Sequence, residues 1–220
     1  MSSERTAIGE TPDPSTDGEG LLRFSVLYPS RDGWKTVLVG GVVLLFFWLI
    51  IPVFIAAGYF VRLTRAAGRG GVEPPAFDDW WDLLVDGVKL VFVMLPAAIV
   101  FALAVYLTAE MSETLAVPVA VAAFYVYPSM YMNYAVTGDW KPAYSPATLF
   151  EQIATTTYLY GFLLYVFVIN GIGVLVGTLL LGVSLLTIVG WVIIWPMVYF
   201  YWYGIDAALW GRVYYRLDTA

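Results

Sequence analysis

Residues 52–89 decide how this chain folds: PVFIAAGYFVRLTRAAGRGGVEPPAFDDWWDLLVDGVK. The stretch begins as the end of an apolar segment. Basic residues follow at the end of that helix, where the helix dipole favours positive charge. Glycines and the pair Pro74–Pro75 stop that helix and force an extended connection. Asp78 or Asp79 then caps a new helix, which leads into the next apolar segment. We therefore expect this first junction to link two membrane helices.

The composition around this junction is that of a membrane protein. Hydrophobic residues make up 60% of the 220 residues and charged residues only 13%, whereas a soluble domain has about 25% charged residues. Long apolar runs separated by short polar turns indicate helices that cross a bilayer. The predicted fold class is all-α, a polytopic helical bundle in the plasma membrane.

Five apolar segments make up the predicted helical membrane domain, residues 34–216. They are residues 35–63, 83–108, 115–136, 155–180 and 189–214. An acidic tail (1–20), which we expect to be disordered, and an interfacial segment (21–33) precede them.

The first segment allows two interpretations. It is longer than the roughly 20 residues that a helix needs to cross a bilayer, and it contains Gly40, Gly41 and Pro52. We favour one tilted, kinked span, because membrane helices tolerate proline. The alternative is a short re-entrant piece up to about Phe47, followed by an outgoing helix.

Basic residues near the segment ends predict the orientation. The junctions and the C-terminal end carry Arg62, Arg65, Arg69, Lys141, Arg212 and Arg216, whereas the two tight turns carry none. The positive-inside rule therefore places the junctions and the C-terminus in the cytoplasm. If all five segments cross the membrane once, the N-terminal tail lies outside the cell. The basic residues Arg23, Arg31 and Lys35 near the tail favour the cytoplasmic side instead, so the sequence leaves the side of the tail undecided.

The second junction, residues 128–150, resembles the first. Proline, tyrosine and a Pro-Ala-aromatic triplet recur in the same order. One interpretation is an internal repeat of residues 35–108 and 115–188 in parallel orientation. The other is chance similarity within an apolar, aromatic-rich chain.

Several function classes are excluded. The chain has no Cys and no His, which removes disulfides, thiolate or imidazole metal sites and every Ser-His or Cys-His nucleophile. The net charge of −6 and the lack of a basic patch argue against nucleic-acid binding. Acid-rich, Lys-poor polar segments indicate a halophilic source. We expect no cofactor and identify no catalytic residue.

Polar residues inside the apolar segments are the candidate functional residues. Asp206 lies a turn or two from the end of the last segment, where an ionisable group normally faces the bundle interior and has a partner. Arg62 or Arg212 is the predicted partner. The pair is either a salt bridge that docks helices or part of a proton or ion relay. Lys89 either pairs with an aspartate one turn away or snorkels.

Asn170 lies near the middle of the fourth segment. Gly173 and Gly177 follow it in a small-xxx-small pattern that lets helices approach closely. We expect Asn170 to hydrogen-bond across that contact, either within the chain or in a homodimer.

Two further groups allow a structural and a functional interpretation. The acidic start of the second helix either docks a partner or merely caps the helix and stays solvated; it comprises Asp78, Asp79, Trp80, Asp82 and Asp86. The aromatic clusters either line a pocket for an isoprenoid or a lipid or form interfacial belts. They comprise Tyr125, Tyr127, Tyr131, Tyr134 and residues 199–203.

The first junction also resembles a known family. The pattern Gly58-Tyr59-x-x-Arg62, then Pro75-x-Phe77-Asp78-Asp79-Trp80, then Asp86-Gly87-x-Lys89 is similar to the membrane-protein family domain of unknown function 4013, frequent in haloarchaea. The resemblance covers roughly residues 28–215. It implies a membrane protein and no catalytic residue.

Three hypotheses about function remain. The first is a non-enzymatic membrane protein that docks a cytoplasmic or membrane protein partner or forms a homo-oligomer in the lipid bilayer. The second is a small-molecule or ion permease that uses Asp206 and Asn170. The third, an enzyme that acts on a lipid with junction carboxylates and Mg²⁺, is weakest because one acidic helix makes a poor metal site.

Overall fold

The computed structural model describes residues 19–184, 187, 192 and 194–219, and every element within them is helical. The elements are α2 (Leu21–Leu27), η1 (Tyr28–Ser30), α3 (Lys35–Leu44), α4 (Ile50–Gly68), α5 (Trp80–Met111), α6 (Glu113–Thr137), α7 (Trp140–Ala143), α8 (Pro146–Ile153), α9 (Thr156–Leu163), the π-helix η2 (Leu164–Ile172), α10 (Gly173–Ser184) and α11 (Trp195–Asp218). The all-α prediction is confirmed. Residues 1–18 of the predicted disordered tail lie outside the described residues, as do residues 185, 186 and 188 of the predicted turn at 181–188. Residues 181–184 of that turn are instead helical and belong to α10.

Four helical stretches of the described chain are long and apolar enough to cross a membrane: Ile50–Gly68, Trp80–Met111, Glu113–Thr137 and Thr156–Leu180. A further helix, α11, spans about 36 Å but carries several charged residues. It is buried among the other helices, so it does not need an apolar exterior. The prediction of a polytopic helical membrane bundle with about five segments is confirmed.

The favoured interpretation of the first segment, one kinked span, is wrong. The segment breaks at residues 45–49, where Leu49 is extended, and α4 begins anew at Ile50. Pro52 is the third residue of α4, where its missing N–H costs no hydrogen bond. The ten residues of α3 reach only about 15 Å, half of the roughly 30 Å hydrocarbon core. The chain therefore enters with α3 and returns with α4, as in the re-entrant alternative.

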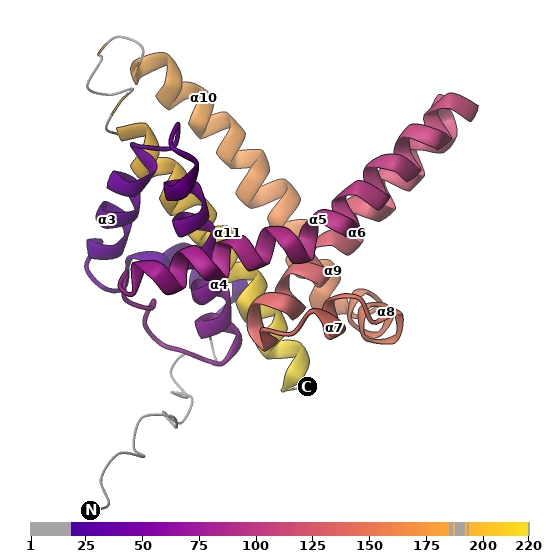
Figure 1. The fold of residues 1–220 in the computed structure, drawn as a ribbon, viewed down its shortest axis with the longest axis horizontal. Helices are drawn as coiled ribbons and strands as arrows, with labels where there is room; N and C mark the ends of the chain where they lie inside the picture. Colours follow the sequence, from indigo (N-terminus) through magenta and orange to yellow (C-terminus); the bar gives the residue numbers. More distant parts are fainter. Residues whose placement is uncertain (1–18, 185–186, 188–191, 193, 220) are drawn as a thin grey trace, which may run out of the picture.

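The helices form antiparallel pairs: α3 with α4, α5 with α6, and the α9–η2–α10 rod with α11. Figure 1 shows α5 and α6 side by side as a long hairpin that projects from the rest of the molecule. The second helix of each pair brings the chain back to the same end of the bundle. We call this end the junction face; it carries residues 69–79, residues 138–155 and the C-terminal end of α11.

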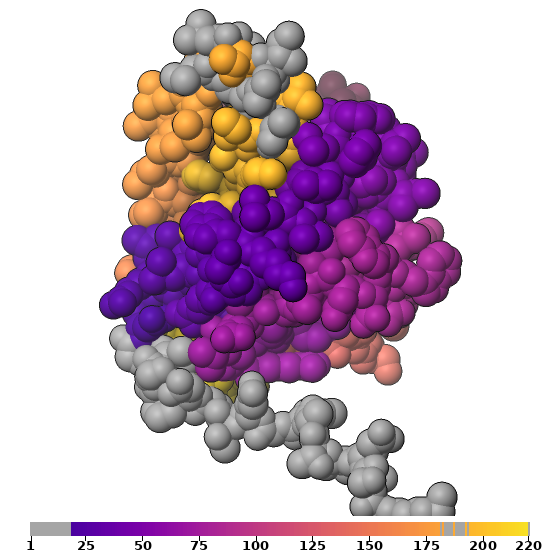
Figure 2. Space-filling view, turned by 90° about the vertical axis from the view of Figure 1, so that its left-hand side faces the viewer, coloured from indigo at the N-terminus to yellow at the C-terminus, as the bar shows by residue number. Residues whose placement is uncertain are grey.

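The main core lies where α4 and α11 meet. Small residues such as Ala67, Ala207 and Ala208 pack there with Tyr59 and Phe200. The N-terminal helices close this core, and Figure 2 shows indigo α2 and α3 lying beside yellow α11. The core thus joins the two ends of the chain.

Glycine permits the closest helix crossings. A Cβ added at Gly58 would overlap the carbonyl oxygen of Leu83, and one at Gly87 would overlap that of Phe54. At another site on α4, a Cβ added at Gly211 of α11 would overlap the carbonyl oxygen of Thr64. Backbone contact of this kind requires small residues in a membrane helix. Helix α4 is therefore held between α5 and α11.

Hydrogen bonds to main-chain carbonyls tie the junction face together. The Tyr28 hydroxyl donates to the Glu73 carbonyl at 2.7 Å, and Arg31 donates to the Val72 carbonyl at 3.0 Å. Arg216 donates to the Glu19 carbonyl at 2.7 Å. Burial raises the pKa of Tyr28 above its ordinary value, which Arg31 and Arg212 partly offset, so this hydroxyl remains a donor. The N-terminal segment thus lies on the junction face.

The proposed internal repeat stays a prediction. In the first copy two helices, α3 and α4, precede the junction, whereas in the second copy only α6 does. The link between α4 and α5 contains no helix, whereas the second junction folds into α7 and α8.

We predict that Gly58→Ala destabilises the bundle by about 1–3 kcal/mol or more, because the added methyl group forces α4 and α5 apart. Unfolding of the purified protein by titrated SDS measures the effect. Gly182→Ala is the matched control, since a Cβ at Gly182 meets nothing within 4 Å. Equal stability of the two variants would refute the close crossing.

The absence of cysteine makes the topology directly testable. Single cysteines at Gly20, Glu73, Asp139 and Asp218 should react with a membrane-impermeant maleimide from one side of sealed vesicles. A cysteine at Glu113, at the far end of the α5–α6 hairpin, should react only from the other side. Labelling of Gly20 and Glu73 from opposite sides would contradict the paired return of α3 and α4.

Candidate functional site

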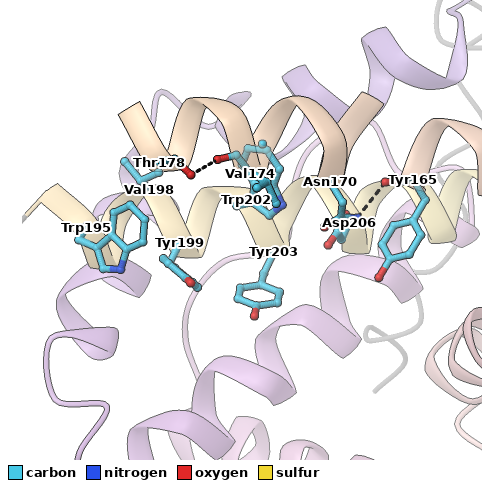
Figure 3. Close-up of a pocket in the computed structure, with 12 residues that line it drawn as sticks. Tyr165, Asn170, Val174, Thr178, Trp195, Val198, Tyr199, Trp202, Tyr203 and Asp206 are labelled. Atoms are coloured by element: carbon cyan, nitrogen blue, oxygen red, sulfur yellow. Dashed lines mark hydrogen bonds between the residues drawn. The ribbon is translucent and has the colours of Figure 1, made fainter. Parts of the chain in front are cut away.

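A groove of about 410 Å³ lies between α10 and α11. Figure 3 shows aromatic side chains of α11 along it, with Asp206, Asn170 and Tyr165 together at one end. The described lining residues are Tyr165, Asn170, Gly173, Val174, Gly177, Thr178, Trp195, Val198, Tyr199, Trp202, Tyr203 and Asp206. Two candidates that the sequence singled out separately, Asp206 and Asn170, thus share one site.

The helical period builds both walls of the groove. On α11 the residues Trp195, Tyr199, Trp202 and Asp206 follow one another at intervals of four, three and four. Such spacing places side chains on one face of a helix. The same holds for the stretch from Asn170 to Thr178 on the opposite wall, where glycines leave the space that the α11 aromatics occupy.

The π-helix η2 sets the position of Asn170. Its Nδ2 donates to the carbonyl of Tyr165, five residues earlier, at 2.8 Å, as Figure 3 shows. Residues in π-helical conformation are rare and often occur at functional sites. The amide therefore bonds within its own helix rather than across a helix contact, which corrects that expectation.

Asp206 lies next to Ala207, whose carbonyl accepts a hydrogen bond from Thr64 near the end of α4 at 3.0 Å. It is the twelfth of the 24 residues of α11, about 18 Å from the C-terminal end of the helix. Its Oδ1 atom is buried and has no hydrogen-bond partner among the described residues. This carboxylate is the only charged group in the described lining of the groove, and one of its oxygens lacks such a partner.

The predicted partners of Asp206 do not reach it. Arg62 forms ion pairs with Asp78 and Asp86 at 3.7 Å. The Arg212 guanidinium lies over the rings of Phe24 and Tyr215. Arg212 lies six positions after Asp206 on α11, which turns the two side chains about 120° apart.

A second charged cluster connects α4 with α5. Asp86 accepts ion pairs from Arg62 and from Arg65, both at 3.7 Å. Lys89 is exposed and has no hydrogen bond or ion pair with a described residue, so the predicted alternative of pairing with Asp86 is not found. Asp86 therefore serves helix packing.

The remaining acidic docking candidates lie on the surface of the junction face. Asp79 is the residue before α5, at a φ of 51°, and its side chain makes no capping hydrogen bond. Asp78 has 65% of its side chain exposed, and Asp82 and Trp80 are exposed as well. Within the described chain, no three Asp or Glu side chains gather as a metal ion would require.

The two glycines of the small-xxx-small pattern, Gly173 and Gly177, pack against α11 of the same chain. The ring of Trp202 occupies the place where Gly173 would carry a Cβ, and Gly177 faces Trp195 across the groove. Of the C-terminal aromatic cluster, Tyr199, Trp202 and Tyr203 line the groove, whereas Phe200 belongs to the main core and Tyr201 donates to the Val26 carbonyl. Tyr125 and Tyr131 lie among core residues and hydrogen-bond to other helices.

The structure contains a pair of hydrogen-bonded side-chain amides that was not among the candidates predicted from the sequence. Asn133 Nδ2 donates to Gln152 Oε1 at 2.7 Å, and Gln152 Nε2 donates to Asn133 Oδ1 at 3.1 Å. The pair joins α6 to α8, with Ser129 as a third member. Each group satisfies another, as buried polar groups require, so the pair stabilises the second junction. Only the spacing of Ser129 and Asn133, four residues apart in an apolar segment, signals it.

Comparisons with known proteins agree with the resemblance at the first junction. No curated protein and no solved structure matches the chain. The model of one family, described as Protein of unknown function (DUF4013), matches residues 41–183. This match includes both junctions and the Asn170 wall of the groove but not α11. It covers more than half of the chain, which therefore belongs to the DUF4013 family.

Proposed function

We propose that this protein is a non-enzymatic membrane protein that takes a small amphipathic molecule from the bilayer into the α10–α11 groove. The observation that carries the proposal is an aromatic groove that ends at Asp206, whose Oδ1 atom is buried without a hydrogen-bond partner among the described residues. Ligand sites are typically apolar clefts of about 300–1,000 Å³ with a few placed polar groups. The groove fits that description, and the permease hypothesis is one form of this function.

Access from the bilayer follows from the exposed rim. Val174 has 71% of its surface exposed and Tyr203 has 48%, although both line the groove. Within membrane-spanning helices, such exposed apolar surface contacts lipid tails. A ligand therefore reaches the groove sideways, from the hydrocarbon core.

The chemistry of the lining favours binding over catalysis. Among the described lining residues Asp206 is the only charged one, and its neighbours are an amide, hydroxyls and aromatic rings. General acid–base catalysis commonly needs a second group of matched pKa. A lipid-acting enzyme is therefore the weaker proposal.

We also infer that the junction face is cytoplasmic. Arg23, Arg31 and Lys35 belong to the N-terminal segment, which lies on that face, and they add to the basic residues of the junctions. The plasma-membrane location and the halophilic source remain predictions from composition.

A second candidate function is partner docking at the junction face. The exposed acidic start of α5, Asp78 to Asp82, favours it, because Trp81 there is 73% exposed. Aromatic residues are enriched at protein interfaces. The partner is then a cytoplasmic or membrane protein, or a second copy of the chain.

We predict that filling the groove blocks the ligand. Gly177→Leu places a side chain in open space, because a Cβ there meets only Trp195 at 3.8 Å. The probe is benzyl alcohol that carries a trifluoromethyl diazirine, used with protein in lipid nanodiscs. Saturable photolabelling of α10 and α11 should fall about tenfold in this variant.

Gly182→Leu is the matched control, since it lies on the same helix outside the groove. It should label like the unmodified protein. Labelling of the groove that competing benzyl alcohol does not reduce, or equal labelling in both variants, would overturn the proposed function.

We predict that a docked partner depends on the acidic surface of the junction face. The double variant Asp79→Asn and Asp82→Asn removes two charges, and asparagine tolerates the left-handed backbone at position 79. A partner cross-linked in the native membrane should decrease at least fivefold, as quantitative mass spectrometry measures. Asp218→Asn, an exposed carboxylate at the C-terminal end of α11, is the control. Equal recovery from both variants argues against docking at this surface.

A further inference from the structure

We propose that the ligand of the α10–α11 groove is a lipophilic cation, an amine or a quaternary onium ion, which binds Asp206 in exchange for one proton. This inference rests on the proposed function, because it names the chemical class that the same groove accepts.

The first argument is the state of the Asp206 carboxylate. Its Oδ1 is buried without a hydrogen-bond partner among the described residues, and no described Arg or Lys pairs with it. Asp86, by contrast, receives two arginines. An isolated ionised carboxylate in an apolar medium is strongly unfavourable. The group therefore requires either a proton or a cation from outside the chain.

The second argument is the lining of the groove. Tyr199, Trp202 and Tyr203 lie along the same helix face as Asp206 or next to it, as Figure 3 shows. Aromatic faces attract cations, most strongly where water is excluded. Lipid-accessible aromatic surface together with one carboxylate selects a molecule that is apolar over most of its area and positively charged at one point. The described lining has no basic residue, so it offers nothing to a lipophilic anion.

The third argument concerns the proton. The titratable groups near Asp206 are tyrosine hydroxyls, those of Tyr131 on α6, Tyr165 on η2 and Tyr203 on α11. None of them supplies a positive charge, and α10 contributes no titratable group to the described lining. Without a ligand, the carboxyl group therefore keeps its proton. When the cation enters, the O–H bond breaks, the proton passes to water and the carboxylate pairs with the cation, so the net charge of the site is unchanged.

Binding of two ions of the same shape and opposite charge tests the charge preference. The full chain in detergent is dialysed to equilibrium with tetraphenylphosphonium or with tetraphenylborate. We expect saturable binding of the cation at one site and none of the anion there. Asp206→Asn should weaken cation binding roughly tenfold or more, the loss of a charge-assisted contact. Asp218→Asn removes an exposed charge outside the groove and should leave binding unchanged.

Titration calorimetry in two buffers of different ionisation enthalpy tests the exchange. Binding of one cation should release about one proton, and the dissociation constant should fall about tenfold per pH unit while the free carboxyl group is protonated. The sign follows because raising the pH removes the proton that competes with the cation. In Asp206→Asn both the proton release and the pH dependence should vanish.

The neutral diazirine probe separates the two proposals. If it labels the groove saturably in Asp206→Asn, the variant is folded and the groove is intact. Saturable labelling together with equal binding of both tetraphenyl ions, or with cation binding that releases no proton, overturns the cation inference and leaves the proposed function standing. Failure of all probes to reach the groove overturns both.

Discussion

The bundle depends on direct backbone contact along α4. Gly58 and Gly87 let α4 cross α5, and Gly211 lets α11 meet the Thr64 turn of α4. In a bilayer, lipid tails are as apolar as the side chains, so close packing rather than burial from water holds helices together. These crossings therefore fix where α11 lies, and with it the wall of the groove that carries Asp206.

Main-chain carbonyls on the junction face impose a second constraint. The last turns of a helix leave carbonyl groups without intrahelical donors. Arg65 and Arg69 donate to the carbonyls of Ala135 and Val136 at the end of α6, at 2.9 and 3.1 Å. Both arginines are on or just after α4, so cations that suit the end of their own helix also satisfy its neighbour. The junction thereby joins two hairpins through main-chain carbonyls, in addition to the ion pair of Arg65 with Asp86.

The sequence predicts the helical membrane class and the common face of both junctions, because hydrophobicity and basic residues report directly on the bilayer. It does not predict the break in the first segment. Residues 45–49 are all apolar, and Pro52 permits either a kink or a new helix start. Tertiary packing decides: Phe200 and Met197 of α11 lie against Gly40 and Gly41, and they hold α3 as a separate short helix. The spacing of the α11 aromatics was visible in the sequence, but the wall that faces them belongs to α10, and only the fold brings the two together.

The contrast between Asp86 and Asp206 explains why the groove and the charged cluster between α4 and α5 differ in role. Asp86 lies near the start of α5, and two arginines within 3.7 Å offset its desolvation. Asp206 lies at the middle of α11, where no described cation offsets the desolvation of its carboxylate. Burying a charge without a partner costs more than helix packing returns, so an aspartate kept for structure alone would be matched as Asp86 is. Because most of helix α11 is packed within the bundle, it can carry such a residue at its middle, and the groove beside α10 is the place where that residue meets an opening of the fold.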